Sequence, residues 1–206
     1  GKIRYLTSGT PQGGVISPLL SNVYLTPFDD ALTEKGYRHI RYADDVLIMC
    51  RTNEEAVEAL EYARTILATL KLELSDEKTK ISTFKDGFDF LGFHFGKGGR
   101  GVGRKSLKSF YQKVRESTKR LQGDKPLKKI VEDLNPILQG WGNYHKEGRN
   151  VGLFTKLDRW VRNRLRSYHN KKWRNRKGTN FRPSQKELKQ IGLFSLKSIL
   201  RPNELH

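Results

Sequence analysis

The chain has 206 residues and a formal net charge of +18, from 40 lysines and arginines against 22 aspartates and glutamates. This length allows one large domain or two small ones, and no apolar run approaches the roughly 18 residues of a membrane-spanning helix. The single cysteine, Cys50, has no partner for an intramolecular disulfide, which is typical of a reducing compartment. Composition therefore argues against a membrane protein and against a disulfide-stabilised scaffold.

The positive charge is concentrated in the second half of the chain. Residues 1–96 hold 11 Lys and Arg against 14 Asp and Glu, a net charge of −3, whereas residues 97–206 hold 29 against 8, a net charge of +21. Self-repulsion makes such a concentration costly unless a polyanion neutralises it. We expect the second half to bind nucleic acid through phosphates, although an anionic membrane surface or a solvated basic tail has the same composition.

The first feature along the chain is a glycine-rich turn that leads into a helix. Pro11 fixes φ, and Gly13 and Gly14 allow a backbone that other residues avoid, so we expect a sharp bend with open amides. Ser17 then reads as a helix N-cap with Pro18 at the first helical position. The helix is predicted from apolar residues at near-helical spacing: Leu19, Leu20, Val23, Tyr24, Pro27, Phe28 and Leu32.

A hairpin is predicted next, with Asp44 and Asp45 at its tip. Residues 37–42 form the first strand and residues 46–50 the second, whose five apolar residues indicate a strand buried on both faces. A solvated turn is the simpler interpretation of two adjacent aspartates. However, two carboxylates beside a buried strand pair need a counter-charge, and a hard divalent cation such as Mg²⁺ supplies one.

The pattern of a helix followed by a strand pair then repeats. A second helix begins near Asn53 as its N-cap, with an apolar stripe. Residues 81–84 and 88–95 are predicted to form the last strand pair. The resulting order, with one more strand in front, is the split βαβ of a ferredoxin-like sheet. The stripe of the second helix consists of Ala56, Leu60, Ala63, Leu67 and Leu70.

The rest of the chain is predicted to be helical. Residues 97–104 read as a flexible, basic, glycine-rich linker; their G-x-G-x-x-G spacing lacks the βαβ context of a dinucleotide site. Three amphipathic stripes follow and predict a small bundle over residues 105–206. The stripes are Leu107, Phe110, Tyr111, Val114 and Leu121; Leu127, Ile130, Val131, Leu134, Leu138 and Trp141; and Leu157, Trp160, Val161, Leu165 and Tyr168.

The third of these helices carries the strongest candidate for a nucleic-acid surface. Any one of its cations is more simply a solvated side chain. As a set with Tyr168 and Trp173 interleaved, they indicate nucleic-acid binding, because cations fix the backbone and aromatic rings stack on bases. The cations are Arg159, Arg162, Arg166, Lys171, Lys172, Arg174 and Arg176.

Four sequence blocks occur in an order that resembles one family. PQGGVISPLLSN, RYADD, LELSDEKTKI and FDFLGFHF are similar to successive blocks of group II intron reverse transcriptases, and the resemblance continues less sharply through residues 134–164. It implies an α+β fold in which residues 1–96 are an incomplete ferredoxin-like polymerase palm and residues 105–206 a three-helix thumb or maturase domain. Family members carry a third catalytic aspartate before the first block, so we expect that the first palm strand and the fingers are absent here.

The resemblance implies an RNA-directed DNA polymerase. Asp44 and Asp45 would hold two Mg²⁺ ions, which Mn²⁺ can replace, with Asp44 as the principal ligand. The incoming dNTP and the primer would lie near Gln12, Gly13, Gly14, Tyr42, Ala43 and Lys78. In isolation, Lys78 reads as a surface lysine.

Several partners follow from the same resemblance. They are an RNA template, a DNA primer, intron RNA and an N-terminal fingers and palm segment. The open edge of the palm sheet predicts pairing with another chain, as in a dimer. A bacterial cytoplasm is the expected compartment, and residues 1–206 alone are expected to be inactive. The alternative is a non-catalytic RNA-binding maturase or splicing factor in which the palm is a scaffold.

Overall fold

The computed structural model describes residues 15–119, 125–148, 150–177 and 183–200, and of residues 169–177 only the backbone. The chain divides into two compact units, residues 1–83 and 84–206. Helices and small sheets make up both units, which agrees with the predicted α+β class.

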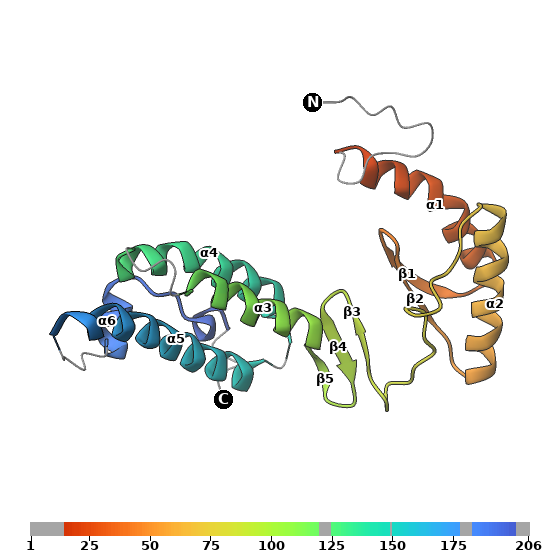
Figure 1. Cartoon of the computed structure of the whole chain (residues 1–206). Coiled ribbons are helices and arrows are strands. Elements are labelled where there is room, and N and C mark those ends of the chain that lie inside the picture. Colours follow the sequence, from red (N-terminus) through yellow and green to blue (C-terminus); the bar gives the residue numbers. More distant parts are fainter. Residues whose placement is uncertain (1–14, 120–124, 149, 178–182, 201–206) are drawn as a thin grey trace, which may run out of the picture. The chain divides into compact units, whose positions relative to one another are not determined.

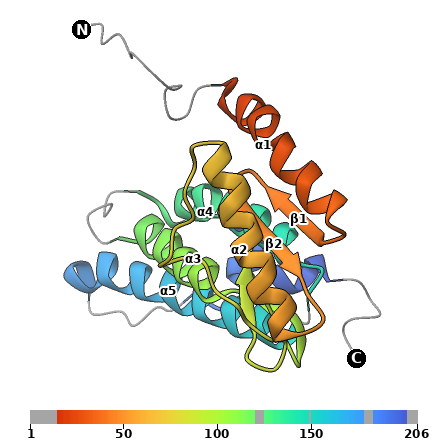
Figure 2. The ribbon, with the colours of Figure 1, turned by 90° about the vertical axis from the view of Figure 1, so that its right-hand side faces the viewer.

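The first unit is a hairpin covered by two helices (Figure 1). Its elements are α1 (Ser17–Glu34), β1 (Arg38–Tyr42), β2 (Asp45–Met49) and α2 (Asn53–Thr69). Figure 2 shows α1 beside β1, with α2 crossing β2. Phe28 and Leu32 of α1 pack with Ala63 and Leu67 of α2 to form the core of this unit, with Val46 and Ile48 of β2 against it. The predicted hairpin and both predicted helices are confirmed.

The second strand is less buried than its five apolar residues predicted. Residues 46–48 are half-buried, and the Met49 side chain is 46% exposed. The two helices pack on the face that carries Val46 and Ile48. Ile40, on the opposite face, is 49% exposed. The prediction of burial on both faces was therefore wrong for the described residues.

Both helix starts are shifted by one residue from the prediction. The N-cap of α2 is Thr52, whose hydroxyl accepts the Glu55 backbone N–H at 3.1 Å, so Asn53 is the first helical residue. The N-cap position of α1 is Ile16, which makes no capping side-chain bond, and Ser17 begins the helix. Thr52 has the extended backbone that is typical of a capping residue, and this conformation was not visible in the sequence.

The second unit begins with a three-stranded sheet, and the last of its strands lies where a flexible linker was predicted. Strands β3 (Phe88–Phe90), β4 (Phe93–Gly96) and β5 (Gly99–Val102) pair antiparallel in sequence order. Gly99 has φ +88°, which lets a two-residue turn join β4 to β5. Residues 81–84, predicted as a strand, form none. The described strands make two separate sheets, so the single ferredoxin-like sheet stays a prediction.

The helices of the second unit follow the predicted stripes. They are α3 (Arg104–Ser117), α4 (Leu127–His145) and α5 (Val151–Lys177), followed by α6 (Gln185–Gln190) and the 3₁₀ helix η2 (Leu196–Ile199). The stripes of α3, α4 and α5 form one buried core, which Leu188, Leu196 and Leu200 join. This C-terminal contribution was not predicted. In the part of the chain that the structure describes, no helix is long and apolar enough to cross a membrane.

Two buried or half-buried polar residues attach the C-terminal segment to the helices. Asp158 of α5 accepts the Ser195 hydroxyl at 2.6 Å and the Leu196 backbone N–H at 2.8 Å, which caps η2. Asn135 of α4 donates to the Gly192 carbonyl at 2.8 Å and accepts the Phe194 N–H at 3.0 Å. These bonds satisfy backbone groups at the start of η2 and in the connection between α6 and η2.

Candidate active site and nucleic-acid interface

The two candidate catalytic aspartates lie at the turn of the β1–β2 hairpin. Tyr42 pairs with Asp45, so the loop consists of Ala43 and Asp44 alone. Ala43 has φ +55°, a left-handed conformation that a two-residue hairpin turn requires and that is strained for a residue other than glycine. Both carboxylates are exposed. The turn therefore presents two adjacent oxygen-rich side chains to solvent.

The two aspartates are the type of ligand that a hard cation prefers, but two carboxylates do not complete its coordination. Mg²⁺ prefers carboxylate oxygens and binds through one or two carboxylates together with waters and substrate phosphates. Asp44 and Asp45 supply two such groups, and no group of three or more His, Cys, Asp or Glu side chains gathers elsewhere among the described residues. The pair could thus hold a metal ion together with ligands from a nucleotide.

The other residues predicted at the nucleotide and primer are placed unequally. Tyr42 and Ala43 adjoin the aspartates in the hairpin, and the Tyr42 side chain is 66% exposed. Lys78 is exposed in a turn where its N–H donates to the Ser75 carbonyl at 3.0 Å. Gln12, Gly13 and Gly14 lie outside the described residues.

The cations predicted on α5 differ in their surroundings. Arg159 is exposed and Arg162 half-exposed. Arg166 donates to the Pro183 carbonyl at 3.0 Å and to the Asn163 side chain at 3.3 Å, so part of its role is to hold the following segment. Four further basic residues belong to the part of α5 of which only the backbone is described: Lys171, Lys172, Arg174 and Arg176.

Sequence reasoning missed a second set of cations, on α3. Arg104, Lys108 and Arg115 follow i, i+4 and i+11 spacing, which places them on one side of the helix, and all three are exposed. Phe110 and Val114 on another side are buried in the core. The available signal was the charge of α3 outside its apolar stripe, five basic residues against one acidic.

One of the α3 cations, Arg115, approaches α5 at a pair of aromatic rings. The Arg115 guanidinium lies 5.8 Å from the Tyr111 ring centre and 5.9 Å from that of Trp160, and the two rings meet edge to face at 4.6 Å. By contrast, Lys125 and Lys129 near the start of α4 form salt bridges with Asp133. Within the described part of the chain, no α3 cation takes part in such a salt bridge. Their charge is available to an external anion.

Two family models match the chain, one in each half. Residues 1–95 match the family described as reverse transcriptase (RNA-dependent DNA polymerase). Residues 107–187 match the group II intron, maturase-specific domain. The chain belongs to the group II intron reverse transcriptase and maturase family. The predicted family resemblance is confirmed.

One curated relative shares part of this sequence. Protein YkfC of Escherichia coli (strain K12) is 35% identical, in a match that covers 45% of this chain and 33% of YkfC. The matched region spans about a third of the length of that relative. The two family models, rather than this relative, therefore support the family assignment over both halves of the chain.

Proposed function

We propose that the protein that contains this chain is an RNA-directed DNA polymerase which extends a DNA primer by metal-dependent nucleotidyl transfer. The observation that carries this proposal is the exposed pair Asp44 and Asp45, held at a two-residue hairpin turn within the segment that matches the reverse transcriptase family. A solvated turn would also expose two aspartates. A solvated turn alone, however, gives no reason for the two aspartates to lie within a segment that matches a polymerase family.

The roles proposed for these residues follow from the match of residues 1–95 to the reverse transcriptase family. Asp44 and Asp45 would hold the divalent ions, with Asp44 as the principal ligand. Ions held by these carboxylates would supply Lewis-acid chemistry to the primer 3′-hydroxyl and to the departing pyrophosphate. Tyr42 and Ala43 would pack against the primer terminus beside them. Gln12, Gly13 and Gly14 would border the incoming nucleotide, and Lys78 would lie near it.

The helical unit would grip the template–primer duplex or intron RNA. Exposed cations on α3 and α5 support this role, since RNA-containing duplexes are bound largely through phosphates and shape. An N-terminal fingers segment and pairing at the edge of the palm sheet remain part of the proposal. We expect residues 1–206 alone to be inactive, because the described residues bring only two carboxylates together at the turn.

A second candidate function is maturase-type RNA binding without polymerisation. The match of residues 107–187 to the maturase-specific domain favours it, and the basic faces of α3 and α5 would serve it equally well. In that case the hairpin would be a scaffold and its carboxylates would be dispensable.

Primer extension separates the two candidates. We expect the full natural protein to extend a DNA primer on an RNA template with Mg²⁺, and to stop when the metal is chelated. Residues 1–206 should extend it only when the N-terminal segment is supplied. Tight RNA binding and splicing support without any extension by the full protein would favour the maturase alternative.

A further inference from the structure

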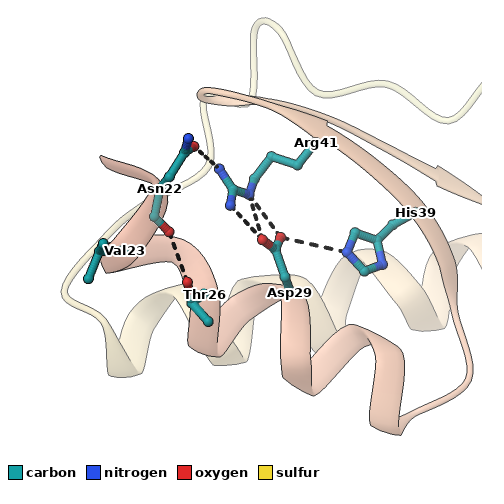
Figure 3. A pocket seen from close by; sticks show the side chains of 6 residues that line it. All are labelled: Asn22, Val23, Thr26, Asp29, His39 and Arg41. Atoms are coloured by element: carbon teal, nitrogen blue, oxygen red, sulfur yellow. Dashed lines mark hydrogen bonds and ion pairs between the residues drawn. The ribbon is translucent and has the colours of Figure 1, made fainter. Parts of the chain in front are cut away.

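Arg41 of β1 makes an unusual set of contacts beside the aspartate turn (Figure 3). Its side chain is only 10% exposed and points toward α1. There its Nε donates to the two Asp29 carboxylate oxygens at 2.8 and 3.0 Å, and its Nη2 donates to Asp29 at 2.5 Å. The hydrogen bonds to Asp29 raise the pKa of Arg41, so the side chain stays charged.

The third nitrogen of the guanidinium connects α1 to the turn itself. Nη1 donates to the Asn22 side-chain oxygen of α1 at 3.0 Å and to the Ala43 backbone carbonyl at 3.1 Å. Asn22 and Asp29 are seven residues apart and therefore lie on the same face of α1. One planar side chain thus joins two helix residues to the carbonyl of the strained turn residue.

The Ala43 carbonyl is part of the peptide group that precedes Asp44. Because a peptide group is planar, a bond that fixes its carbonyl oxygen also fixes the direction of the Asp44 N–H and the approach to its Cα atom. The left-handed φ of Ala43 is strained and persists only when its surroundings hold it. Arg41 supplies such a restraint from a half-buried site.

We propose that Arg41 is a positioning residue: anchored by Asp29 and Asn22, it fixes the turn peptide and thereby the direction in which the Asp44 carboxylate projects. This inference rests on the proposed polymerase function, in which Asp44 is the principal metal ligand. Lysine cannot replace arginine here, since one ammonium group lacks the planar fork that reaches three acceptors at once. His39, whose Nε2 lies 3.6 Å from Asp29, borders the same pocket, as do Val23 and Thr26.

The test is steady-state primer extension by the full natural protein carrying Arg41→Lys. We expect kcat to fall about 10- to 100-fold, as misplaced reacting groups do, and the half-saturating Mg²⁺ concentration to rise several-fold. The KM for dNTP and the affinity for an RNA–DNA duplex should stay within about twofold, because Arg41 contacts neither in this account. Arg38→Lys, an exposed arginine on the same strand, is the matched control and should change none of these values.

Asp29→Asn provides an independent variant, with Asp30→Asn, its exposed neighbour, as control. It should reproduce the loss of kcat and the higher Mg²⁺ requirement. If Arg41→Lys does not fold, as judged by circular dichroism, Asp29→Asn and Asn22→Ala decide the question. Wild-type kcat and Mg²⁺ dependence in the folded variants would overturn the inference, and so would a loss of activity explained by weaker duplex binding. A wild-type protein without any extension would instead contradict the proposed function.

Discussion

His145 illustrates at the residue scale how burial fixes a charge state. Its side chain is fully buried between the rings of Phe93, Trp141 and Tyr144, at 4.6–4.9 Å between centroids, and its Nε2 lies 2.8 Å from the Ser106 hydroxyl. Burial lowers the pKa of His145 to about 4 from an ordinary value of 6.5. The neutral imidazole therefore belongs to the packing between β4, α3 and α4.

This burial predicts that the helical unit loses stability on acidification. Between pH 6.5 and about 4 the unfolded chain binds a proton at His145 that the folded chain excludes. The contribution of the neutral His145 to stability should thus be fully present above pH 7. The free energy of unfolding should fall by roughly 3 kcal/mol as the pH drops through that window. All three tryptophans, at positions 141, 160 and 173, lie in the second unit, so urea unfolding followed by tryptophan fluorescence reports on this unit.

A variant with glutamine at position 145 separates this effect from other titrations. His145→Gln should be less stable at neutral pH yet lose much of the pH dependence. His39→Gln, in the first unit, should leave the fluorescence transition unchanged. A transition whose midpoint does not move between pH 7 and pH 4.5 in the wild-type protein would contradict the role of His145.

At the scale of single elements, the cap of α2 gives a direct test. Replacing Thr52 with alanine removes the hydroxyl that accepts the Glu55 N–H and should lower the free energy of unfolding by about 1 kcal/mol. Asn53→Ala, at the first helical position, should have a smaller effect or none. Chemical denaturation followed by circular dichroism would show which variant loses more stability. A larger loss from Asn53→Ala would mean that Asn53 is the N-cap, as predicted from the sequence.

Two glycines of α4 should respond in opposite directions to the same substitution. A Cβ at Gly142 would lie 2.4 Å from Ile199 Cδ1 and 2.9 Å from Leu196 Cδ2, so Gly142→Ala should destabilise the packing of η2 by about 1–3 kcal/mol. A Cβ at Gly140 meets no atom within 4 Å, so Gly140→Ala should stabilise the helix by about 0.5–1 kcal/mol. Thermal melts of the two variants check both signs, and two shifts of equal sign would contradict this packing.

Helices and strands were predictable where apolar side chains recur at a regular spacing along the sequence. Alternating and apolar runs predicted the β1–β2 hairpin, and stripes predicted α1 to α5. Strand β5 was missed because two of its four residues are glycine and its pairing depends on the edge of β4. The start of α2 was missed because Thr52 and Asn53 are both good caps, and only the backbone conformation chooses between them.

The sequence predicted the carboxylates of the candidate site but not the residues that hold them in place. The Asp44–Asp45 pair and its hairpin follow from sequence. The bonds of Arg41 to Asp29 and Asn22 span 12 and 19 residues and exist only once α1 packs on β1. The α3 cations were overlooked because their common side becomes evident only when the helix boundaries and the buried stripe are known.

At the scale of the whole molecule, charge separation predicts salt-dependent nucleic-acid binding. The logarithm of affinity should fall linearly with the logarithm of salt concentration, with a slope on the order of −4 if about five cations contact phosphates. Combining Arg104→Ala with Lys108→Ala should flatten the slope by up to about two units and weaken all sequences alike. Arg162→Ala should act in the same direction on α5.

The matched control for this titration removes cations that are already neutralised. Combining Lys125→Ala with Lys129→Ala breaks salt bridges to Asp133 and should change the slope less than the α3 pair does. Fluorescence anisotropy with an RNA–DNA duplex, from low to moderate salt, measures both. An affinity that does not depend on salt would show that the basic faces serve solubility.

The most direct measurement of the central claim is extension of a DNA primer on an RNA template by the full natural protein carrying Asp44→Asn. The substitution keeps the size of the side chain and removes one ligand charge. Extension should fall by orders of magnitude at saturating Mg²⁺, while duplex affinity and the unfolding transition stay as in the wild type. Asp30→Asn, an exposed aspartate on α1, should extend normally. Near-normal extension by the Asp44→Asn protein would remove Asp44 from the active site and contradict the account.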